Sequence, residues 1–383
     1  MTDFRLVLNR NPGTPGTVIL PEAGYRRARA EITSWPGYAP TALRELHFPG
    51  PASVRYKDES TRFGLGSFKA LGGAYAALKV IAAELARGGV ANNATGAELE
   101  TGQHREAAGQ ITVTCATDGN HGRSVAWGAQ RFGARCVIFV HQHVSQGRRD
   151  AIARYGAEIR EVAGNYDDSV RVAQETAEAE GWFVISDTSY PGYTEPPRDV
   201  MQGYRLMAEE AIAALPEPPT HVFVPGGVGG VAAAVAVQLR AMCGAGPRLI
   251  IAEPERAACL TDSLEAGAFT TVGGDLDTLM AGLACGEPSL LAWQELERSA
   301  FASMALPDSA VPGAMRRLAE QDIEAGESAV AGVIALDFAW ADPAARQALG
   351  LGPESRVLIF GTEGATDPEL YNRLVSSKSA SRD

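Results

Sequence analysis

The sequence predicts an α/β protein with two lobes, each with an open, mostly parallel twisted sheet flanked by helices. From Ile111 onward, short β-rich runs alternate with Ala-rich helical stretches, which is the order of β-α-β units. Several of the strand runs are continuously apolar, as expected for parallel strands covered by helices on both faces. The 383 residues also exceed the ~100–200 residues of a usual domain, so we expect two domains.

The elements follow one another in a regular order after residue 110. The first strands and helices are predicted at 111–117, 122–132, 134–140, 147–156 and 158–162. Further strands are predicted at 182–188, 220–227, 248–255 and 356–364. The polar residues 91–110 are expected to form a loop between a helix and a strand.

The composition excludes several classes of function. The net charge of −12 disfavours nucleic acid and anionic membranes as partners, because both require clustered Lys and Arg. The start of the chain does not resemble a signal peptide, and no apolar run reaches the ~18 residues of a membrane span, so we expect a cytoplasmic protein. The five cysteines show no C-x-x-C spacing, and we predict no metal site.

Four strand ends carry unusual residues for a protein of this class. In open α/β sheets, ligands bind outside the carboxyl ends of the strands, so these positions are the candidate site. They are Thr117-Asp118-Gly119-Asn120-His121-Gly122, Asp187-Thr188-Ser189-Tyr190, Gly226-Gly227-Val228-Gly229-Gly230 and Gly361-Thr362-Glu363-Gly364.

Upstream of these strand ends, Lys69 stands between a Gly/Ser turn and a predicted helix, in KDESTRFGLGSFKALGG. This segment resembles the S-F-K lysine motif of the fold-type-II pyridoxal 5′-phosphate (PLP) enzymes, the tryptophan-synthase-β and threonine-dehydratase superfamily. Its sequence resembles the corresponding segment of the diaminopropionate ammonia-lyase family in particular. Leu71 stands where general dehydratases usually carry Arg. The resemblance implies that Lys69, beside Phe68, holds the cofactor as a Schiff base and serves as a base. The alternative to this role is that Lys69 is an ordinary, solvent-exposed lysine of a helix.

The same resemblance, which runs from about Arg26 to Tyr371, implies an arrangement of domains. Residues 1–81 and 191–383 would form a large PLP-binding domain, and residues 82–190 a small mobile domain. The family expectation for assembly is a homodimer.

The glycine loop after the strand THVFVP predicts an anion site. Its bare backbone N–H groups and the following helix N-terminus surround one point. In fold-type-II enzymes the corresponding loop, here Gly226, Gly227, Val228, Gly229 and Gly230, binds the PLP phosphate. The same residues match a dinucleotide fingerprint, Gly227-x-Gly229-x-x-Ala232 with Glu253 about 20 residues on. An NAD enzyme, however, would leave the lysine motif and two other strand ends without a role.

The residues after the first strand resemble the S-x-G-N-H stretch of related enzymes. That resemblance implies that Thr117, Gly119 and His121 bind the substrate carboxylate and that Asn120 binds the cofactor 3′-oxygen. Asp118 departs from the small neutral residue of dehydratases, and a carboxylate beside a substrate carboxylate costs Coulomb energy. Asp118 therefore pairs with a second ammonium of the substrate, acts as a base on the face opposite Lys69, or caps the next helix. His121 is expected to be packed rather than catalytic.

Two further strand ends complete the predicted site. Asp187 resembles the aspartate of the family's D-T-x-x-x-G-Y loop, which faces the active site, and the alternative is an Asx-turn before Pro191. Thr362 resembles the hydroxyl residue that meets the pyridine nitrogen in dehydratases, and the alternative is a local turn bond.

Together these features predict a PLP-dependent lyase that eliminates ammonia from 2,3-diaminopropionate, the L-isomer and possibly the D-isomer, to give pyruvate. The alternatives are dehydration of serine, threonine or hydroxyaspartate and, more distantly, an NAD-dependent oxidoreductase.

Cys259 and Cys285 follow motif-bearing segments, and Cys285 lies in a stretch that resembles the family's M-A-G-L loop, so a disulfide between them is a further possibility.

Overall fold

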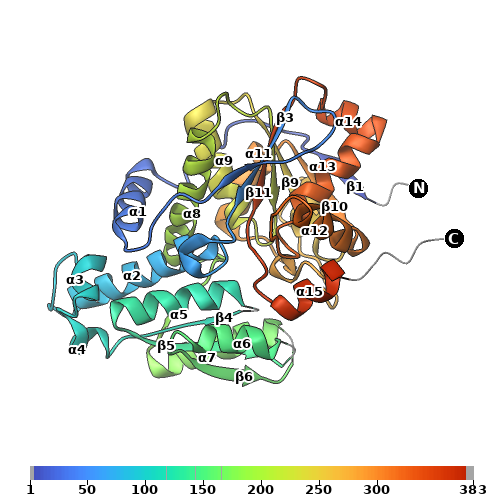
Figure 1. The fold of residues 1–383 in the computed structure, drawn as a ribbon. Coiled ribbons are helices and arrows are strands. Elements are labelled where there is room, and N and C mark those ends of the chain that lie inside the picture. The colour runs from blue at the N-terminus through green and yellow to red at the C-terminus, as the bar shows by residue number, and fades with distance from the viewer. Residues whose placement is uncertain (1–3, 118, 143, 165, 377–383) are drawn as a thin grey trace. The chain divides into compact units, whose positions relative to one another are not determined.

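The computed structural model describes residues 4–117, 119–142, 144–164 and 166–376 (Figure 1). The chain divides into two compact units, each considered by itself below. Unit 1 contains Met1–Ile19, Pro40–Ser67 and Ala208–Asp383, and unit 2 contains Leu20–Ala39 and Phe68–Met207. The predicted α/β class is confirmed, whereas the predicted large and small mobile domains stay a prediction.

Unit 1 is built on a seven-stranded sheet of the order β1-β10-β9-β8-β11-β3-β2. The five inner strands are parallel, and only β1 and β2 at the edges pair antiparallel with their neighbours. The strands are β1 (Arg5–Leu8), β2 (Leu43–Glu45), β3 (Ser53–Asp58), β8 (His221–Pro225), β9 (Arg248–Pro254), β10 (Ala302–Leu306) and β11 (Arg356–Gly361).

The helices of unit 1 cover this sheet, with α12 and α13 on one side of the strands and α9 on the other (Figure 1). Residues of α12 and α13 share a buried core with β8 to β11. The helices are α9 (Gly230–Cys243), α10 (Cys259–Ala266), α11 (Leu290–Ser299), α12 (Val311–Ala319), α13 (Ala331–Ala341), α14 (Pro343–Leu349) and α15 (Pro368–Ser376), with 3-10 turns η1 (Arg62–Gly64), η2 (Glu255–Ala257), η3 (Ala281–Leu283) and η4 (Asp308–Ala310).

Unit 2 is built on a four-stranded parallel sheet of the order β6-β5-β4-β7. Its strands are β4 (Thr112–Ala116), β5 (Arg135–His141), β6 (Glu158–Val162) and β7 (Phe183–Val184). Its helices are α1 (Glu22–Ser34), α2 (Lys69–Arg87), α3 (Gly96–Glu100), α4 (Arg105–Ala108), α5 (Asn120–Phe132), α6 (Gln146–Ala153) and α7 (Tyr166–Glu180), and α8 (Glu195–Ala213) crosses into unit 1.

Helix α2, which begins at Lys69, packs closely on α5. A Cβ at Gly128 would lie 2.7 Å from Cα of Ala74, and a Cβ at Gly73 would lie 1.9 Å from Oγ of Ser124. Glycine therefore allows the two helix backbones to approach, which fixes the first turn of α2 beside the first turn of α5. Lys69 and Asn120 are the first residues of these two helices.

One local prediction was wrong. Residues 91–110 were expected to be a loop, but they contain α3 and α4. The hydroxyl of Thr95 accepts a hydrogen bond from the N–H of Glu98, and the Glu98 carboxylate accepts one from the N–H of Thr95. This capping box stabilises a short helix in a polar segment. No helix of the described residues is long and apolar enough to span a membrane.

Candidate active site

Lys69 forms an ion pair with Asp187 in unit 2. Its Nζ donates to Oδ2 of Asp187, which lies after the short strand β7. Both side chains are partly accessible, at 20% for Lys69 and 15% for Asp187. Burial raises the pKa of Asp187, but the charges of Lys69 and His121 together with the hydrogen bond from Lys69 outweigh this effect and hold that pKa below its ordinary value. The two residues predicted from separate motifs are thus brought into contact.

The loop that carries Asp187 is held by a tyrosine rather than by the carboxylate itself. The hydroxyl of Tyr193 accepts a hydrogen bond from the N–H of Ser186 and donates to the carbonyl oxygen of Val184. The N–H of Thr188 is bonded to the hydroxyl of Ser186. These bonds shape the turn and leave the Asp187 carboxylate directed at Lys69.

Two aromatic rings border the amine of Lys69. Its Nζ lies 5.3 Å from the ring centroid of Phe68 and 5.8 Å from that of Tyr204, and the rings lie 4.5 Å apart. Tyr204 is buried, and a Cβ at Gly72 would lie 2.4 Å from its ring, so α2 holds the ring in place. The sequence did not indicate Tyr204, because its spacing on α8 resembles that of an ordinary core residue.

His121 is buried next to this ion pair. Its Nε2 lies 2.8 Å from the carbonyl oxygen of Ile185, and its Nδ1 lies 3.9 Å from Oδ2 of Asp187. Burial lowers the pKa of His121, against the opposing effect of Asp187. The ring is therefore neutral near pH 7. It is packed, as predicted, yet Nδ1 makes no hydrogen bond with the described residues.

Thr117 organises the turn after β4. Its hydroxyl accepts hydrogen bonds from the N–H groups of Gly119 and Gly122, at 3.0 and 3.1 Å. The amide oxygen of Asn120 accepts a bond of 2.6 Å from Arg123, which leaves its NH₂ group as the donor side. Asp118, to which we assigned a catalytic or substrate-binding role, lies outside the described residues.

The glycine loop of unit 1 has the geometry of an anion site. It follows β8 and leads into α9, and Gly227 and Gly229 adopt positive φ angles of 60° and 91°. Such angles favour glycine. The N–H of Gly226 donates a hydrogen bond to the carbonyl oxygen of Ala252, and the N–H of Gly229 donates one to the carbonyl oxygen of Gly226. No hydrogen bond among the described residues uses the N–H of Gly227 or Val228. Two backbone donors at a helix N-terminus are thus available.

Thr362 is buried directly after β11, in unit 1. The strand end is tied to the segment before Lys69, because Ser67 pairs with Glu363 and the N–H of Gly364 donates to the carbonyl oxygen of Gly66. Within unit 1, these contacts hold Gly66 and Ser67 against the strand end that carries Thr362.

Glu253 does not have the place of a ribose-binding acid. It is fully buried and accepts hydrogen bonds from the N–H groups of Leu260 and Thr261, at 3.0 and 2.7 Å, and from the hydroxyl of Thr261. Its carboxylate therefore caps the N-terminus of α10. Burial raises the pKa of Glu253 to about 7. Glu253 is therefore not placed as the ribose-binding acid that a dinucleotide site requires.

The possible disulfide between Cys259 and Cys285 is not present in this structure, in which neither sulfur is bonded to another cysteine. Cys259 is buried, and its thiol lies 3.7 Å from the carbonyl oxygen of Gly227. Burial raises the pKa of Cys259.

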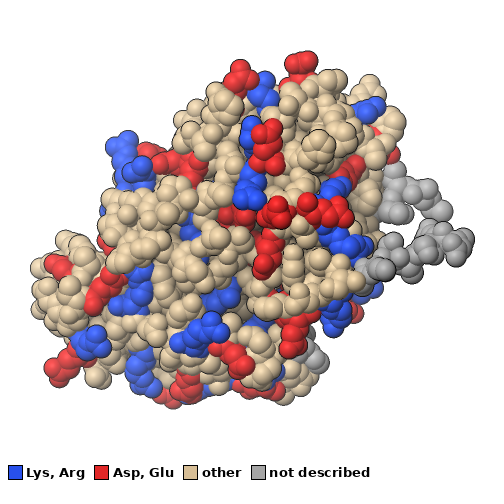
Figure 2. Space-filling model, viewed as in Figure 1, with Lys and Arg blue, Asp and Glu red and all other residues tan. Residues whose placement is uncertain are grey.

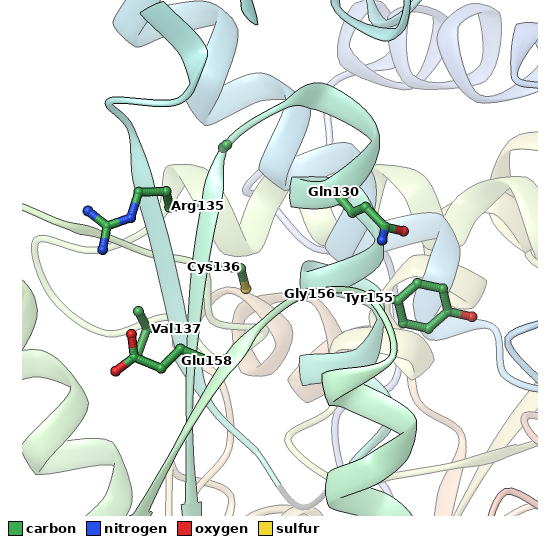
Figure 3. A pocket seen from close by; sticks show the side chains of 8 residues that line it. Gln130, Arg135, Cys136, Val137, Tyr155, Gly156 and Glu158 are labelled. Atoms are coloured by element: carbon green, nitrogen blue, oxygen red, sulfur yellow. The ribbon is translucent and has the colours of Figure 1, made fainter. Parts of the chain in front are cut away.

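One pocket of unit 2 lies at the amino ends of its strands. It has a volume of about 320 Å³ and is lined by residues at the starts of β5 and β6, among them Arg135, Cys136 and Glu158. Parallel sheets bind ligands at the opposite, carboxyl ends of their strands. Figure 3 shows the Arg135 and Glu158 side chains directed away from Tyr155 and Gln130, so no polar groups converge on a ligand.

The charged side chains give no sign of another kind of site. Figure 2 shows Lys and Arg scattered among Asp and Glu on the viewed face, without a basic patch. Among the described residues, no group of three or more His, Cys, Asp or Glu side chains could hold a metal ion.

Comparisons with known proteins agree with this chemistry. Residues 34–363 match the family model "Pyridoxal-phosphate dependent enzyme". The chain is 38% identical to diaminopropionate ammonia-lyase of Escherichia coli K12 over 359 residues, 88% of each chain. It is 25% identical to a probable D-serine dehydratase of Pediococcus pentosaceus, over 71% of this chain and 65% of the other. The crystal structure of the E. coli ammonia-lyase with D-serine matches with a TM-score of 0.87 and 34% identity, covering 97% and 96% of the two chains.

Proposed function

This chain belongs to the diaminopropionate ammonia-lyase family of PLP-dependent enzymes, with the fold-type-II architecture predicted from its sequence, and on that premise we propose that it eliminates ammonia from 2,3-diaminopropionate. The observation that carries the proposal is the ion pair of Lys69 with Asp187, next to the acceptor nitrogen of His121. An amine that can bind the cofactor thus lies beside a carboxylate that can bind an amine.

Each unit, taken by itself, offers residues that suit one part of the cofactor. The N–H groups of Gly227 and Val228, at the N-terminus of α9, suit a phosphate, and the partly accessible Lys69 suits an aldehyde. We assign Gly226 and Gly229 to Gly230 to the same loop, Asn120 to the phenolic oxygen, Thr362 to the ring nitrogen and Phe68 to the ring. When bound, PLP withdraws electrons from the α-carbon of an attached amino acid.

Lys69 is the base of the proposed reaction. Its free amine takes the α-proton of the L-isomer, and the resulting ammonium can pair with Asp187 again once the β-amino group has left as ammonia. The backbone from Thr117 to His121, Gly119 included, orients the substrate carboxylate. Asp118 serves as the base for the D-isomer or binds the substrate's second ammonium. The released aminoacrylate hydrolyses in water to pyruvate and a second ammonia.

Asp187 supports a diamino substrate over a hydroxy substrate. A β-ammonium can form an ion pair with this carboxylate, whereas the β-hydroxyl of serine can only donate a neutral hydrogen bond, which is weaker. D-Serine is the second candidate substrate, because the E. coli relative was crystallised with it and probable D-serine dehydratases are similar to this chain.

The homodimer and the cytoplasmic location are further parts of the proposal. The family resemblance supports the dimer, and light scattering after size-exclusion chromatography tests it.

The decisive experiment measures pyruvate and ammonia from D- and L-2,3-diaminopropionate, serine and threonine with the purified PLP-loaded chain. We expect the highest kcat/KM with a diaminopropionate isomer and two ammonia molecules per pyruvate. A higher kcat/KM with serine, with one ammonia per pyruvate, would assign the chain to the dehydratases instead.

A further inference from the structure

His121 carries a buried acceptor that no hydrogen bond of the described residues uses. A carbonyl oxygen can only accept, so the 2.8 Å contact of Nε2 with Ile185 places the ring hydrogen on Nε2. Nδ1 then carries a lone pair, and this atom is buried without a partner. Buried polar atoms are rarely left unpartnered, and each one requires an explanation.

The lone pair of His121 lies beside a second acceptor. Nδ1 is 3.9 Å from Oδ2 of Asp187, and the low pKa of that carboxyl group keeps it ionised. Two acceptors at this separation repel one another unless a hydrogen-bond donor lies near both. The donor at Asp187 in this structure is the ammonium of Lys69. The pair of acceptors therefore has the chemistry of a site for a primary ammonium group.

Lys69 cannot supply that ammonium throughout the reaction. While its nitrogen is bonded to the cofactor it is not a free primary ammonium, and a base must be neutral before it accepts a proton. The carboxylate and Nδ1 then require another cation. A substrate with a second amino group brings one.

We propose that Asp187 and Nδ1 of His121 form a subsite for the β-ammonium of the substrate, which replaces the ammonium of Lys69 there. His121 is thereby a specificity-determining residue. This inference rests on the proposed function, since it assumes a substrate with two amino groups.

The exchange of one ammonium for another has two chemical consequences. A β-ammonium bound at Asp187 offsets the charge of this carboxylate, which removes its stabilisation of the Lys69 ammonium and favours the neutral amine of Lys69. Lys69 then takes the α-proton, and the electrons of the broken C–H bond form the carbon-carbon double bond. The β-nitrogen keeps its three hydrogens, so the C–N bond breaks with its electron pair going to nitrogen. Neutral ammonia leaves without a further proton donor.

The subsite can be tested without turnover, in the full chain freed of cofactor. Lys69→Ala removes the native cation, so we expect saturable calorimetric binding of ethylammonium with a Kd of about 1–10 mM, and none of ethanol. The wild-type chain should bind ethylammonium at least about tenfold more weakly, because Lys69 occupies the subsite. Adding Asp187→Asn should abolish binding.

Two replacements of His121 separate the subsite from simple packing. Gln places its amide nitrogen near Nε2 and keeps a donor for Ile185, whereas Asn places its amide near Nδ1 and keeps an acceptor. In the Lys69→Ala background, His121→Gln should weaken ethylammonium binding at least about fivefold, and His121→Asn should weaken it less. Equal binding in all three chains, or none in Lys69→Ala alone, would overturn the inference.

The holoenzyme supplies an independent readout. His121→Gln should lower the ratio of kcat/KM for diaminopropionate to that for serine by about tenfold, and His121→Asn should largely preserve it. An unchanged ratio in His121→Gln would contradict the subsite. If the wild-type enzyme formed no pyruvate from diaminopropionate, the proposed function would fail instead, while the ethylammonium titration would still judge the subsite.

Discussion

Two lysines of one segment, twelve positions apart, have opposite environments. Lys57, on β3, is 1% exposed, and its Nζ donates to Glu210 at 2.6 Å and to the carbonyl oxygen of Thr41 at 2.9 Å. Lys69 is 20% exposed and pairs with Asp187, next to a histidine nitrogen that forms no hydrogen bond with any residue that the structure describes. Lys57 is buried among fixed acceptors, whereas Lys69 lies where a ligand could take over its contact.

The neighbours of Lys57 extend this contrast. Arg62 is buried and donates to both Glu59 and Glu210, so two basic and two acidic side chains form one buried charge cluster in unit 1. Three members of this cluster, Lys57, Glu59 and Arg62, precede the turn that leads to Lys69, and the fourth, Glu210, lies on α8. Buried and fully paired charges hold a conformation, whereas a partly accessible charge beside an unpartnered acceptor is available for chemistry.

The largest effect is expected from replacing Lys69. Lys69→Ala should lower pyruvate formation by at least about 1,000-fold, because nucleophile and base are lost together. The unfolding free energy should fall by about 1–3 kcal/mol, because the mostly buried Asp187 carboxylate loses its cationic partner. Assays of pyruvate and of urea unfolding test both parts. Near-normal pyruvate production would end the distinction between the two lysines.

The charge cluster should show the reverse behaviour. Arg62→Met removes one member and leaves Glu59 and Glu210 under-paired, so the unfolding free energy should fall by about 3–5 kcal/mol. Lys57→Met should act in the same direction. Both are measured by urea unfolding, with kcat per folded molecule kept within about threefold. A loss of turnover without a loss of stability would make the cluster part of the site.

Replacing Asp118 tests whether this acid, like Asp187, takes part in catalysis or substrate binding. Asp118→Asn should lower turnover of D-diaminopropionate by about 100-fold and leave the L-isomer much less affected, if this carboxylate is the base on the second face. Pyruvate formation from the separate isomers gives the answer. Equal losses would make Asp118 a binding residue, and no loss would leave it as a helix cap.

Glu253 is a buried acid on the structural side, and its effect should be the smallest. Its pKa of about 7 lies above the ordinary 4.5, so the folded chain binds the proton more tightly than the unfolded chain. This contribution to stability is complete below pH 4.5 and is lost as the pH rises through 7, by roughly 3 kcal/mol. Glu253→Gln should remove that slope from the pH dependence of unfolding. A mutant with the wild-type slope would contradict the assignment.

The sequence predicted the α/β class and the strands that are continuously apolar, such as β8 and β9. It did not indicate β3 or β10. β3 carries Arg55 and Lys57 although it lies inside the sheet, and Lys57 is buried only because distant residues supply its acceptors. β10 reads ASMAL, which lacks the β-branched residues typical of strands.

The site was predictable where one motif determines the local conformation, as in the glycine loop and the turn before Lys69. The contacts that join separate motifs were not. The pairing of Lys69 with Asp187, the place of Tyr204 and the unpartnered nitrogen of His121 depend on segments far apart in the chain. Local spacing contains no information on such contacts.

The measurement that tests the central claim most directly is borohydride reduction of the PLP-loaded chain, followed by peptide mass spectrometry. The sequence has four lysines, Lys57, Lys69, Lys79 and Lys378. Reduction makes the lysine-cofactor bond permanent, so we predict the pyridoxyl phosphate mass on Lys69 alone, at close to one group per chain. A label on another lysine, or a reduced chain without any label, would contradict the account.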